Sequence, residues 1–283
     1  MMATRLPTVE SSKTTTNSCS GALAGGGKVS ASRERKRLPK WFKTSLPIGK
    51  SQSVYNSTMA SVKENDLNTV CVEARCPNIH DCWGRGTATF MIAGDVCTRG
   101  CRFCAVNTAK IPPPLNPDEP EDLATAIENM GINHAVITVV NRDDLSDGGA
   151  SHYRRCIMAV HDRCPDVGIE LLCSDLDGNL ESLKLLLNGL PIRVFAHNVE
   201  CVPRLDKIVR DRRASFKQSL EILSEAKALR PDLKTKTSIM VGIGETDSEV
   251  IEAMEMIRSS EVDMITLGPV SYTHLTLPTM ELV

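Results

Sequence analysis

The sequence lacks a long apolar run, and none approaches the roughly 20 consecutive apolar residues of a membrane-spanning helix. It also lacks an excess of charge of either sign, because the 283-residue chain has a formal net charge of −2. That balance gives no argument for nucleic acid or an acidic membrane surface, and we expect neither partner. The remaining composition, 24% charged and 41% apolar, is ordinary for a soluble globular protein of barrel-domain size.

Acidic residues are scarce at the start of the chain, where residues 1–32 contain only Glu10 and are rich in Ser, Thr, Gly and Ala. Such a segment buries too little apolar surface to fold alone, so we expect residues 1–37 to be a disordered tail. An organelle transit peptide has a similar composition, but this segment has no clear Arg-bearing amphipathic face. We therefore expect a cytoplasmic protein, with a mitochondrial or plastid location as the alternative if the tail is a transit peptide.

Cysteine is unevenly distributed, since six of the eleven cysteines form two groups close together. Cys97, Cys101 and Cys104 follow a strand-like apolar run at residues 87–94. A loop that leaves such a strand can place three thiolates around one [4Fe–4S] cluster with one iron left open. A zinc site needs a fourth ligand at ligand spacing, and nothing between Cys104 and His134 supplies one. A disulfide framework suits small secreted domains. We call residues 97–104 the cluster loop.

A second group, the upstream cysteines, consists of Cys71, Cys76 and Cys82 around a Pro-Asn pair that favours a loop. Three thiolates here would hold a second cluster. Zinc is the alternative, with His80 as the fourth ligand, and the residue types alone allow it. His80 is equally a candidate for a surface histidine without a ligand role.

The cluster loop resembles the signature of the radical S-adenosylmethionine (SAM) enzymes. Both cysteine groups, with the run Gly86-Thr-Ala-Thr-Phe-Met-Ile92 between them, closely resemble those of lipoyl synthases. The resemblance implies that the open iron of the cluster loop chelates the methionine end of SAM, and that one electron from the cluster releases a 5′-deoxyadenosyl radical. It also implies that the upstream cysteines hold an auxiliary [4Fe–4S] cluster that is consumed as the sulfur source.

Alternating helix-like and strand-like segments follow the cluster loop. Helices are predicted at residues 54–66, 118–130, 150–163, 180–187, 215–229 and 248–258, and strands at residues 87–93, 135–140, 168–173, 193–197, 236–241 and 263–268. Asp118 is the predicted cap of its helix, with Pro120 in the first turn. Repeated βα units give an α/β fold with a parallel sheet. Six of them suit the partial (β/α)6 barrel of the radical SAM enzymes.

The predicted barrel covers residues 87–268, with a cysteine-bearing extension at residues 38–86 before it and an atypical tail at residues 269–283 after it. In such barrels the functional loops gather at the C-terminal ends of the strands. Asp143 and Asp144 follow the second strand, in a run that resembles a lipoyl synthase segment contacting the methionine end of SAM. A solvated acidic turn is the alternative interpretation of this run.

Two later strands are followed by further candidate SAM-binding residues. Asn198 and Glu200 lie in a His-Asn-x-Glu stretch that resembles the family and could hydrogen-bond SAM or substrate, with capping of the next helix as the alternative. Gly242 and Gly244 would allow the backbone close to an adenine, as in the family, although such a turn is common by itself. The other cysteines show no ligand spacing and receive no function: Cys19, Cys156, Cys164, Cys173 and Cys201. Cys156 and Cys173 are expected in the core.

The resemblance to lipoyl synthases extends from about Leu38 to Gly268. Family members continue further and end in an Arg-Ser-Ser-Tyr stretch, in which one serine supplies the fourth ligand of the auxiliary cluster. Residues 269–283 do not continue the pattern, and we interpret Arg258-Ser-Ser260 as coincidence. We therefore expect the chain as given to make little lipoyl product.

The resemblance implies insertion of two sulfur atoms at C6 and C8 of a protein-bound octanoyl group. The implied partners are an octanoylated lipoyl carrier domain (of an oxoacid dehydrogenase E2 or a glycine-cleavage H protein) and a ferredoxin or flavodoxin reductant. No catalytic acid or base is expected, because the cofactor carries the difficult chemistry. Another radical SAM sulfur-inserting enzyme, such as a biotin-synthase-like one, and a non-catalytic metal-binding scaffold are the alternatives.

Overall fold

The computed structural model describes residues 48–64 and 79–269. The helices are α1 (Lys50–Glu64), α3 (Ile79–Gly84), α4 (Glu119–Met130), α5 (Ala150–Arg163), α6 (Leu180–Leu187), α7 (Asp206–Val209), α8 (Phe216–Leu229) and α9 (Asp247–Ser259). The longer strands are β1 (Thr87–Ile92), β4 (His134–Val139), β5 (Gly168–Leu172), β6 (Val194–Ala196), β7 (Lys234–Val241) and β8 (Met264–Pro269). Two short strands are β2 (Val96–Cys97) and β3 (Asn107–Thr108). Within these described residues, no helix combines the length and apolar character needed to cross a bilayer.

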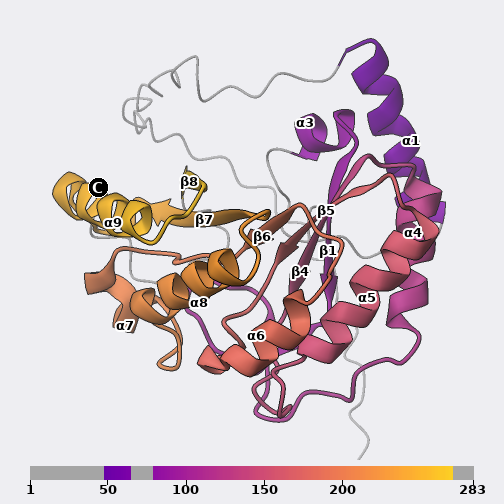
Figure 1. Cartoon of the computed structure of the whole chain (residues 1–283). Coiled ribbons are helices and arrows are strands. Elements are labelled where there is room, and N and C mark those ends of the chain that lie inside the picture. Colours follow the sequence, from indigo (N-terminus) through magenta and orange to yellow (C-terminus); the bar gives the residue numbers. More distant parts are fainter. Residues whose placement is uncertain (1–47, 65–78, 270–283) are drawn as a thin grey trace, which may run out of the picture. The chain divides into compact units, whose positions relative to one another are not determined.

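The six longer strands form one sheet in which strand order follows chain order, β1-β4-β5-β6-β7-β8. Every neighbouring pair is parallel. Helices α4, α5, α6, α8 and α9 occupy successive connections between the strands, and Figure 1 shows them arranged in that order along the sheet. The predicted α/β class and the six parallel strands joined by helices are thereby confirmed.

The main core lies between the sheet and these helices. On β1, Ala88, Phe90 and Ile92 are at most 4% exposed and belong to one apolar cluster with Ile127 of α4 and Tyr153 of α5. The alternate residues of β1 are half-buried, because side chains of a strand point to opposite faces of the sheet. The face of the sheet away from the helices is therefore the less buried one.

Helices α6, α8 and α9 each start with a side-chain cap, but the predicted cap of α4 is wrong. Asp118 makes no side-chain hydrogen bond to α4. Its backbone N–H instead donates to Oδ1 of Asn116, at 3.0 Å, which places the aspartate in a turn before the helix. Pro120 does lie in the first turn, as predicted. Ser215 caps α8 by accepting a hydrogen bond from the N–H of Gln218.

Candidate functional site

A cavity of about 290 Å³ lies at the C-terminal ends of the strands. Cys97, Cys101 and Cys104 all line this cavity, so the structure brings the three predicted cluster ligands together. Met91, Thr138 and Leu172, which occupy one register row across β1, β4 and β5, form part of its wall. This is the end of a parallel sheet at which barrel enzymes bind their ligands. A larger groove of about 790 Å³ between α5, α6 and α8 contains none of the predicted site residues.

The cluster loop is closed at its base by a short parallel ladder. Val96 of β2 pairs with Asn107 of β3, and Cys97 pairs with Thr108. Within the loop, the N–H of Cys104 donates to the carbonyl oxygen of Cys101, at 3.1 Å. Sequence patterns did not predict β2 and β3, because two-residue strands have no periodicity to detect.

The sulfur atoms of the cluster loop have backbone N–H groups directed at them. The N–H of Arg99 lies 3.4 Å from Sγ of Cys97, and the N–H of Asp211 lies 3.3 Å from Sγ of Cys101. Burial raises the pKa of Cys101 to about 11, and burial also raises the pKa of Cys104. A bound metal favours the thiolate form, which such a site otherwise disfavours. Three sulfurs on one cavity with N–H donors behind them fit an iron–sulfur cluster.

Arg99 joins the cluster loop to the loops that follow β4 and β5. Its side chain is buried, with Nη2 at 2.8 Å from Oδ1 of Asp143 and Nη1 at 2.7 Å from Oδ2 of Asp175. Burial alone would lower the pKa of Arg99, but the hydrogen bonds to these two carboxylates raise it above its ordinary value. Gln218 of α8 also donates to Asp175, at 2.8 Å. Sequence reasoning missed this network, although Arg99 lies inside the cysteine motif.

Asp143 and Asp144, predicted to contact SAM, are both engaged in ion pairs. Nη1 of Arg213 lies 3.1 Å from Asp143, which also binds Arg99. Arg142 donates through Nε and Nη2 to the two carboxylate oxygens of Asp144, and this pairing lowers the pKa of that carboxyl. Neither aspartate is among the residues that line the cavity. They hold the loop after β4, and their contact with SAM stays a prediction.

Asn198 and Glu200, the second predicted pair, do line the cavity. Glu200 has a φ of 67°, and its backbone bridges to β7 at Ile239. Burial raises the pKa of Glu200. The alternative role as a helix cap is not observed, since the next helical segments begin after Val202 and Leu205 with no side-chain cap.

His197, beside this pair, is held as a neutral ring. Its Nδ1–H donates to the carbonyl oxygen of Cys173, at 2.8 Å, so Nε2 accepts from the hydroxyl of Ser219, at 2.9 Å. Burial lowers the pKa of His197 to about 4. His197 therefore shapes the cavity wall without carrying charge at neutral pH.

Gly242 and Gly244 lie in the loop after β7, both with positive φ. The N–H of Gly242 donates to Oε1 of Glu245, and the N–H of Ile243 donates to its Oε2, at 2.9 Å. These glycines are not among the residues lining the cavity. Their conformation explains the glycine requirement of the turn, and a contact with adenine stays a prediction.

The predictions for the upstream cysteines fall mostly outside the described residues. Cys71 and Cys76 belong to residues 65–78, which the structure does not describe. Cys82 is half-buried on α3, and the His80 ring lies against Tyr55, with ring centroids 4.7 Å apart. Cys19 also lies outside the described residues.

The other cysteines are mostly in the interior. Cys156, Cys173 and Cys201 are buried and Cys164 is half-buried. Burial of Cys156 and Cys173 matches the predicted core role, and Cys173 also lines the cavity. Burial raises the pKa of each of these thiols, which is about 12 for the three buried ones.

A second cluster of polar groups, which sequence reasoning missed, lies at the end of β1. Glu119 accepts hydrogen bonds from the N–H groups of residues 93–94, at 2.8 and 3.2 Å, and pairs with Nε2 of His152. Sγ of Cys156 lies 3.6 Å from the same nitrogen, so the three groups are close enough to hold a metal. Arg155 donates to Nδ1 of His152, however, which leaves the ring proton on Nε2, facing Glu119. We therefore assign this cluster a structural role.

Sequence comparison identifies the family of the chain. The family described as the Radical SAM superfamily matches residues 91–257, and the N-terminal domain of lipoyl synthase of that family matches residues 10–76. The mitochondrial lipoyl synthase of Rattus norvegicus is 49% identical over 241 residues, which are 83% of this chain and 63% of that protein. The mitochondrial lipoyl synthase of Drosophila melanogaster is 48% identical over 240 residues, with the same coverage. The chain thus spans less than two thirds of these relatives.

Solved structures agree on the fold. HydG, the FeFe-hydrogenase maturase of Carboxydothermus hydrogenoformans, has a TM-score of 0.54 at 13% identity, over 79% of this chain and 63% of that one. Methylornithine synthase has a TM-score of 0.51 at 12% identity, over 79% of this chain and 61% of that one. Such low identity shows the fold alone. The family match, the parallel sheet and the three convergent cysteines place this chain in the radical SAM superfamily, whose members use SAM and a [4Fe–4S] cluster, and in sequence it resembles the lipoyl synthases.

Proposed function

We propose that the chain serves a lipoyl synthase reaction, the SAM-dependent insertion of two sulfur atoms at C6 and C8 of a protein-bound octanoyl group. The observation that carries the proposal is the convergence of Cys97, Cys101 and Cys104 on one cavity, in a chain 49% identical to a mitochondrial lipoyl synthase. The proposal concerns activity, substrate and partners, because the chain spans 63% of that relative.

The cavity is lined by both apolar and polar side chains, which suits an acyl substrate and a polar cofactor. Met91, Phe103 and Leu172 line it with apolar side chains that suit an unbranched acyl chain and exclude water. Asn198 and Glu200 offer an amide and a carboxyl group that suit the hydroxyl and ammonium groups of SAM. We propose Asp143, Asp144, Gly242 and Gly244 as further residues of the SAM site, acting through the loops they hold.

The cysteines of the cluster loop would hold one [4Fe–4S] cluster with an open iron for SAM. When bound, the cluster and SAM supply the one-electron chemistry that removes hydrogen from an unactivated carbon, which side-chain acids and bases cannot do. The chain's own residues fix the positions: Arg99 ties the cluster loop to Asp143 and Asp175, and β2 and β3 close its base. No described side chain is assigned as a catalytic acid or base.

The upstream cysteines, with Cys82 on α3, are proposed to hold a second [4Fe–4S] cluster that donates the sulfur. The match of residues 10–76 to the N-terminal domain of lipoyl synthase supports this part. The proposed partners are an octanoylated carrier domain and a ferredoxin or flavodoxin reductant. A mitochondrial location is better supported than the expected cytoplasmic one, since relatives from several animals are named mitochondrial lipoyl synthases.

Metal analysis of anaerobically purified protein tests the cluster. We expect iron and sulfide in near-equal amounts, and zinc in their place would refute the proposal in favour of a metal-binding scaffold. Reduced protein should cleave SAM to 5′-deoxyadenosine. Cys101→Ala should abolish this product, while Cys164→Ala, a half-buried cysteine outside the cavity, should retain it.

Mass spectrometry of an octanoylated carrier domain tests the reaction itself. The expected product has two sulfur atoms in place of two hydrogens. Because we expect the chain as given to make little of this product, the assay also uses the chain with a lipoyl synthase C-terminal segment that ends in Arg-Ser-Ser-Tyr joined after Gly268. SAM cleavage without sulfur transfer by this extended protein, with both clusters loaded, would show that the chain serves a different radical SAM reaction.

A further inference from the structure

Residues 209–213, which run from the last residue of α7 into the connection to α8, make four hydrogen bonds to the cluster loop. The N–H of Arg102 donates to the carbonyl oxygen of Val209, at 2.9 Å. Nη2 of Arg213 donates to the carbonyl oxygen of Thr98, at 2.6 Å. The other two bonds involve Asp211. A segment more than 100 residues away in sequence thus contacts most of the loop's length.

Asp211 contacts the cluster loop through both its side chain and its backbone. Its Oδ2 accepts a hydrogen bond from the N–H of Gly100, at 3.0 Å, and its own N–H points to Sγ of Cys101, at 3.3 Å. Its Oδ1 accepts from Nε of Arg213, at 2.9 Å. Burial would raise the pKa of Asp211, but the bonds from Arg213 and Gly100 hold it well below its ordinary value. The carboxylate is therefore ionised and fixed in place.

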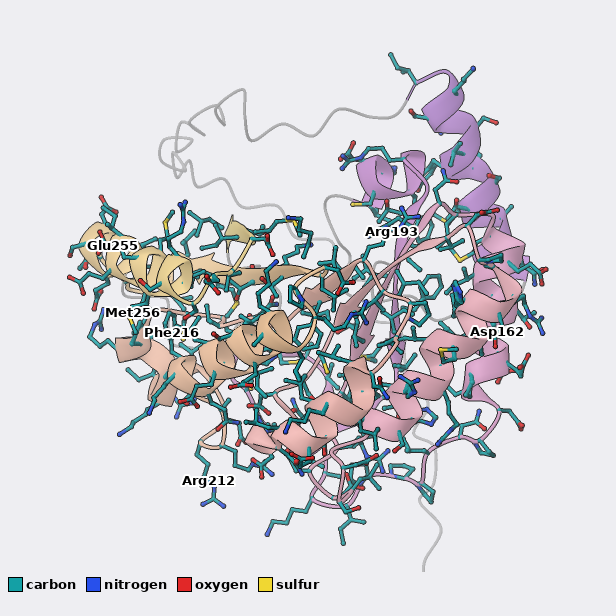
Figure 2. All side chains as sticks on the ribbon, in the orientation of Figure 1. Asp162, Arg193, Arg212, Phe216, Glu255 and Met256 are labelled. Atoms are coloured by element: carbon teal, nitrogen blue, oxygen red, sulfur yellow. The ribbon has the colours of Figure 1, made fainter. Side chains whose placement is uncertain are left out.

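The segment is anchored to the rest of the fold by its neighbours. Val209 is buried, and the buried guanidinium of Arg210 donates to the carbonyl oxygen of Val199, at 3.1 Å, and to Oγ of Ser219, at 2.9 Å. Arg212 extends away from the ribbon, as Figure 2 shows. The N–H of Asp211 is thus held at a defined distance from the sulfur.

An N–H group directed at a ligand sulfur stabilises negative charge on that sulfur. A cluster gains negative charge when it is reduced, so such a donor favours the reduced state and raises the reduction potential. A carboxylate that holds the loop backbone has a second effect, because partners beyond the direct ligands also determine how firmly a metal site is held. The two groups of Asp211 therefore act on different properties of the site.

We propose that Asp211 is a positioning residue for the cluster: its carboxylate fixes the loop through Gly100, and its backbone N–H favours the reduced state through Cys101. The inference rests on the proposed function, since it needs a cluster on the cluster loop. It assigns a role in this site to the connection between α7 and α8, which carries no cluster ligand.

Two substitutions separate the two roles. Asp211→Ala removes the carboxylate and keeps the N–H, and Asp211→Pro removes both. Proline is compatible with the preceding backbone, because Arg210 has a ψ of 163°. In the described structure the only recorded partner of this N–H is Cys101. Asp232→Ala is the matched control, since Asp232 pairs with Arg230 two positions away, as Asp211 pairs with Arg213.

The measurements use the 283-residue chain, reconstituted anaerobically. Iron release to a chelator should be about ten to a hundred times faster in Asp211→Ala than in Asp232→Ala. The midpoint potential of the cluster, from a redox titration followed by electron paramagnetic resonance, should be more negative in Asp211→Pro than in Asp211→Ala. Equal potentials in these two variants would overturn the role of the N–H, and a release rate equal to the control would overturn the role of the carboxylate.

The outcomes are separable from those that test the function. Wild-type protein without iron and sulfide contradicts the proposed function, whereas a wild-type cluster with unaffected Asp211 variants contradicts only this inference. Circular dichroism checks the fold of each variant. If Asp211→Pro unfolds at the assay temperature, the release rate of Asp211→Ala decides whether Asp211 positions the loop.

Discussion

Nη1 of Arg99 lies 2.7 Å from Oδ2 of Asp175, and both side chains are at most 2% exposed. The two residues are 76 positions apart, one in the cluster loop and one in the loop after β5. The same guanidinium binds Asp143 in the loop after β4. One side chain therefore fixes the distances between three loops around the cavity. Removing one partner of such a buried pair is strongly destabilising, because the other partner then remains as a buried charge with no opposite charge beside it.

Arg99→Met should lower the free energy of unfolding by about 3–5 kcal/mol, because it leaves Asp175 and Asp143 without their cation. Arg163→Met is the control: Arg163 pairs with Glu121 at the surface, and its loss should cost about 1 kcal/mol or less. Urea unfolding followed by circular dichroism measures both. Equal losses in the two variants would show that the Arg99 network does not stabilise the fold.

Glu119→Gln should loosen the turn between β1 and the cluster loop. Ala93 has a φ of 69°, and the Glu119 carboxylate holds it by accepting two backbone N–H bonds. A glutamine amide presents only one acceptor, so one N–H loses its partner. Hydrogen–deuterium exchange should become faster in the peptide that contains residues 93–94. Glu121→Gln, an exposed position on the same helix, should leave exchange there unchanged.

Stability should fall as the pH falls from about 6.5 to about 4, in part through His197. Burial lowers the pKa of this ring from 6.5 to about 4, so the unfolded chain binds the proton more tightly than the folded one. The contribution of His197 to the free energy of unfolding is complete above pH 6.5 and is lost as the pH falls to about 4. The total loss is up to about 3 kcal/mol.

His197→Gln should therefore show a smaller loss of unfolding free energy between pH 6.5 and pH 4.5 than the wild type. His161→Gln is the control, because that ring is half-exposed on α5. Urea titrations at several pH values measure the effect. If the free energy of unfolding of His197→Gln falls with pH as steeply as that of the wild type, His197 is not the cause of this acid sensitivity.

Gly149→Ala should be more destabilising than Gly189→Ala, although both glycines have positive φ. A Cβ at Gly149 would lie 2.7 Å from ring atoms of Tyr153, whereas one at Gly189 would meet nothing within 4 Å. Left-handed backbone costs an alanine about 1 kcal/mol, and overpacking against a buried ring adds about 1–3 kcal/mol. Thermal unfolding of the two variants checks the order, and a reversed order would show that the Tyr153 ring yields freely.

The sequence predicted the features that depend on local pattern. Apolar runs placed all six sheet strands within about two residues, and the spacing of Cys97, Cys101 and Cys104 predicted that they share one site. Asp118 was misassigned because Asn116, two residues earlier, competes for the turn before α4. Local propensity cannot decide between such neighbours.

Long-range pairing was beyond the reach of the sequence. The contacts of Arg99 with Asp175, and of Asp211 with Cys101, join residues 76 and 110 positions apart. They follow from where the strand ends meet in space, and no periodic pattern encodes that meeting. Asp143 was predicted to contact SAM because its run follows a strand and resembles a lipoyl synthase segment. The sequence did not predict that arginines from two other loops bind it, and its contact with SAM stays a prediction.

The alternation along β1 gives the two faces of the sheet different evolutionary freedom. Ala88, Phe90 and Ile92 are packed against helices, so their substitution disturbs the interior on which folding depends. Met91 faces the cavity, in register with Thr138 and Leu172, and these positions have looser surroundings. Substitutions on this inner face can change the shape offered to a ligand while the scaffold persists.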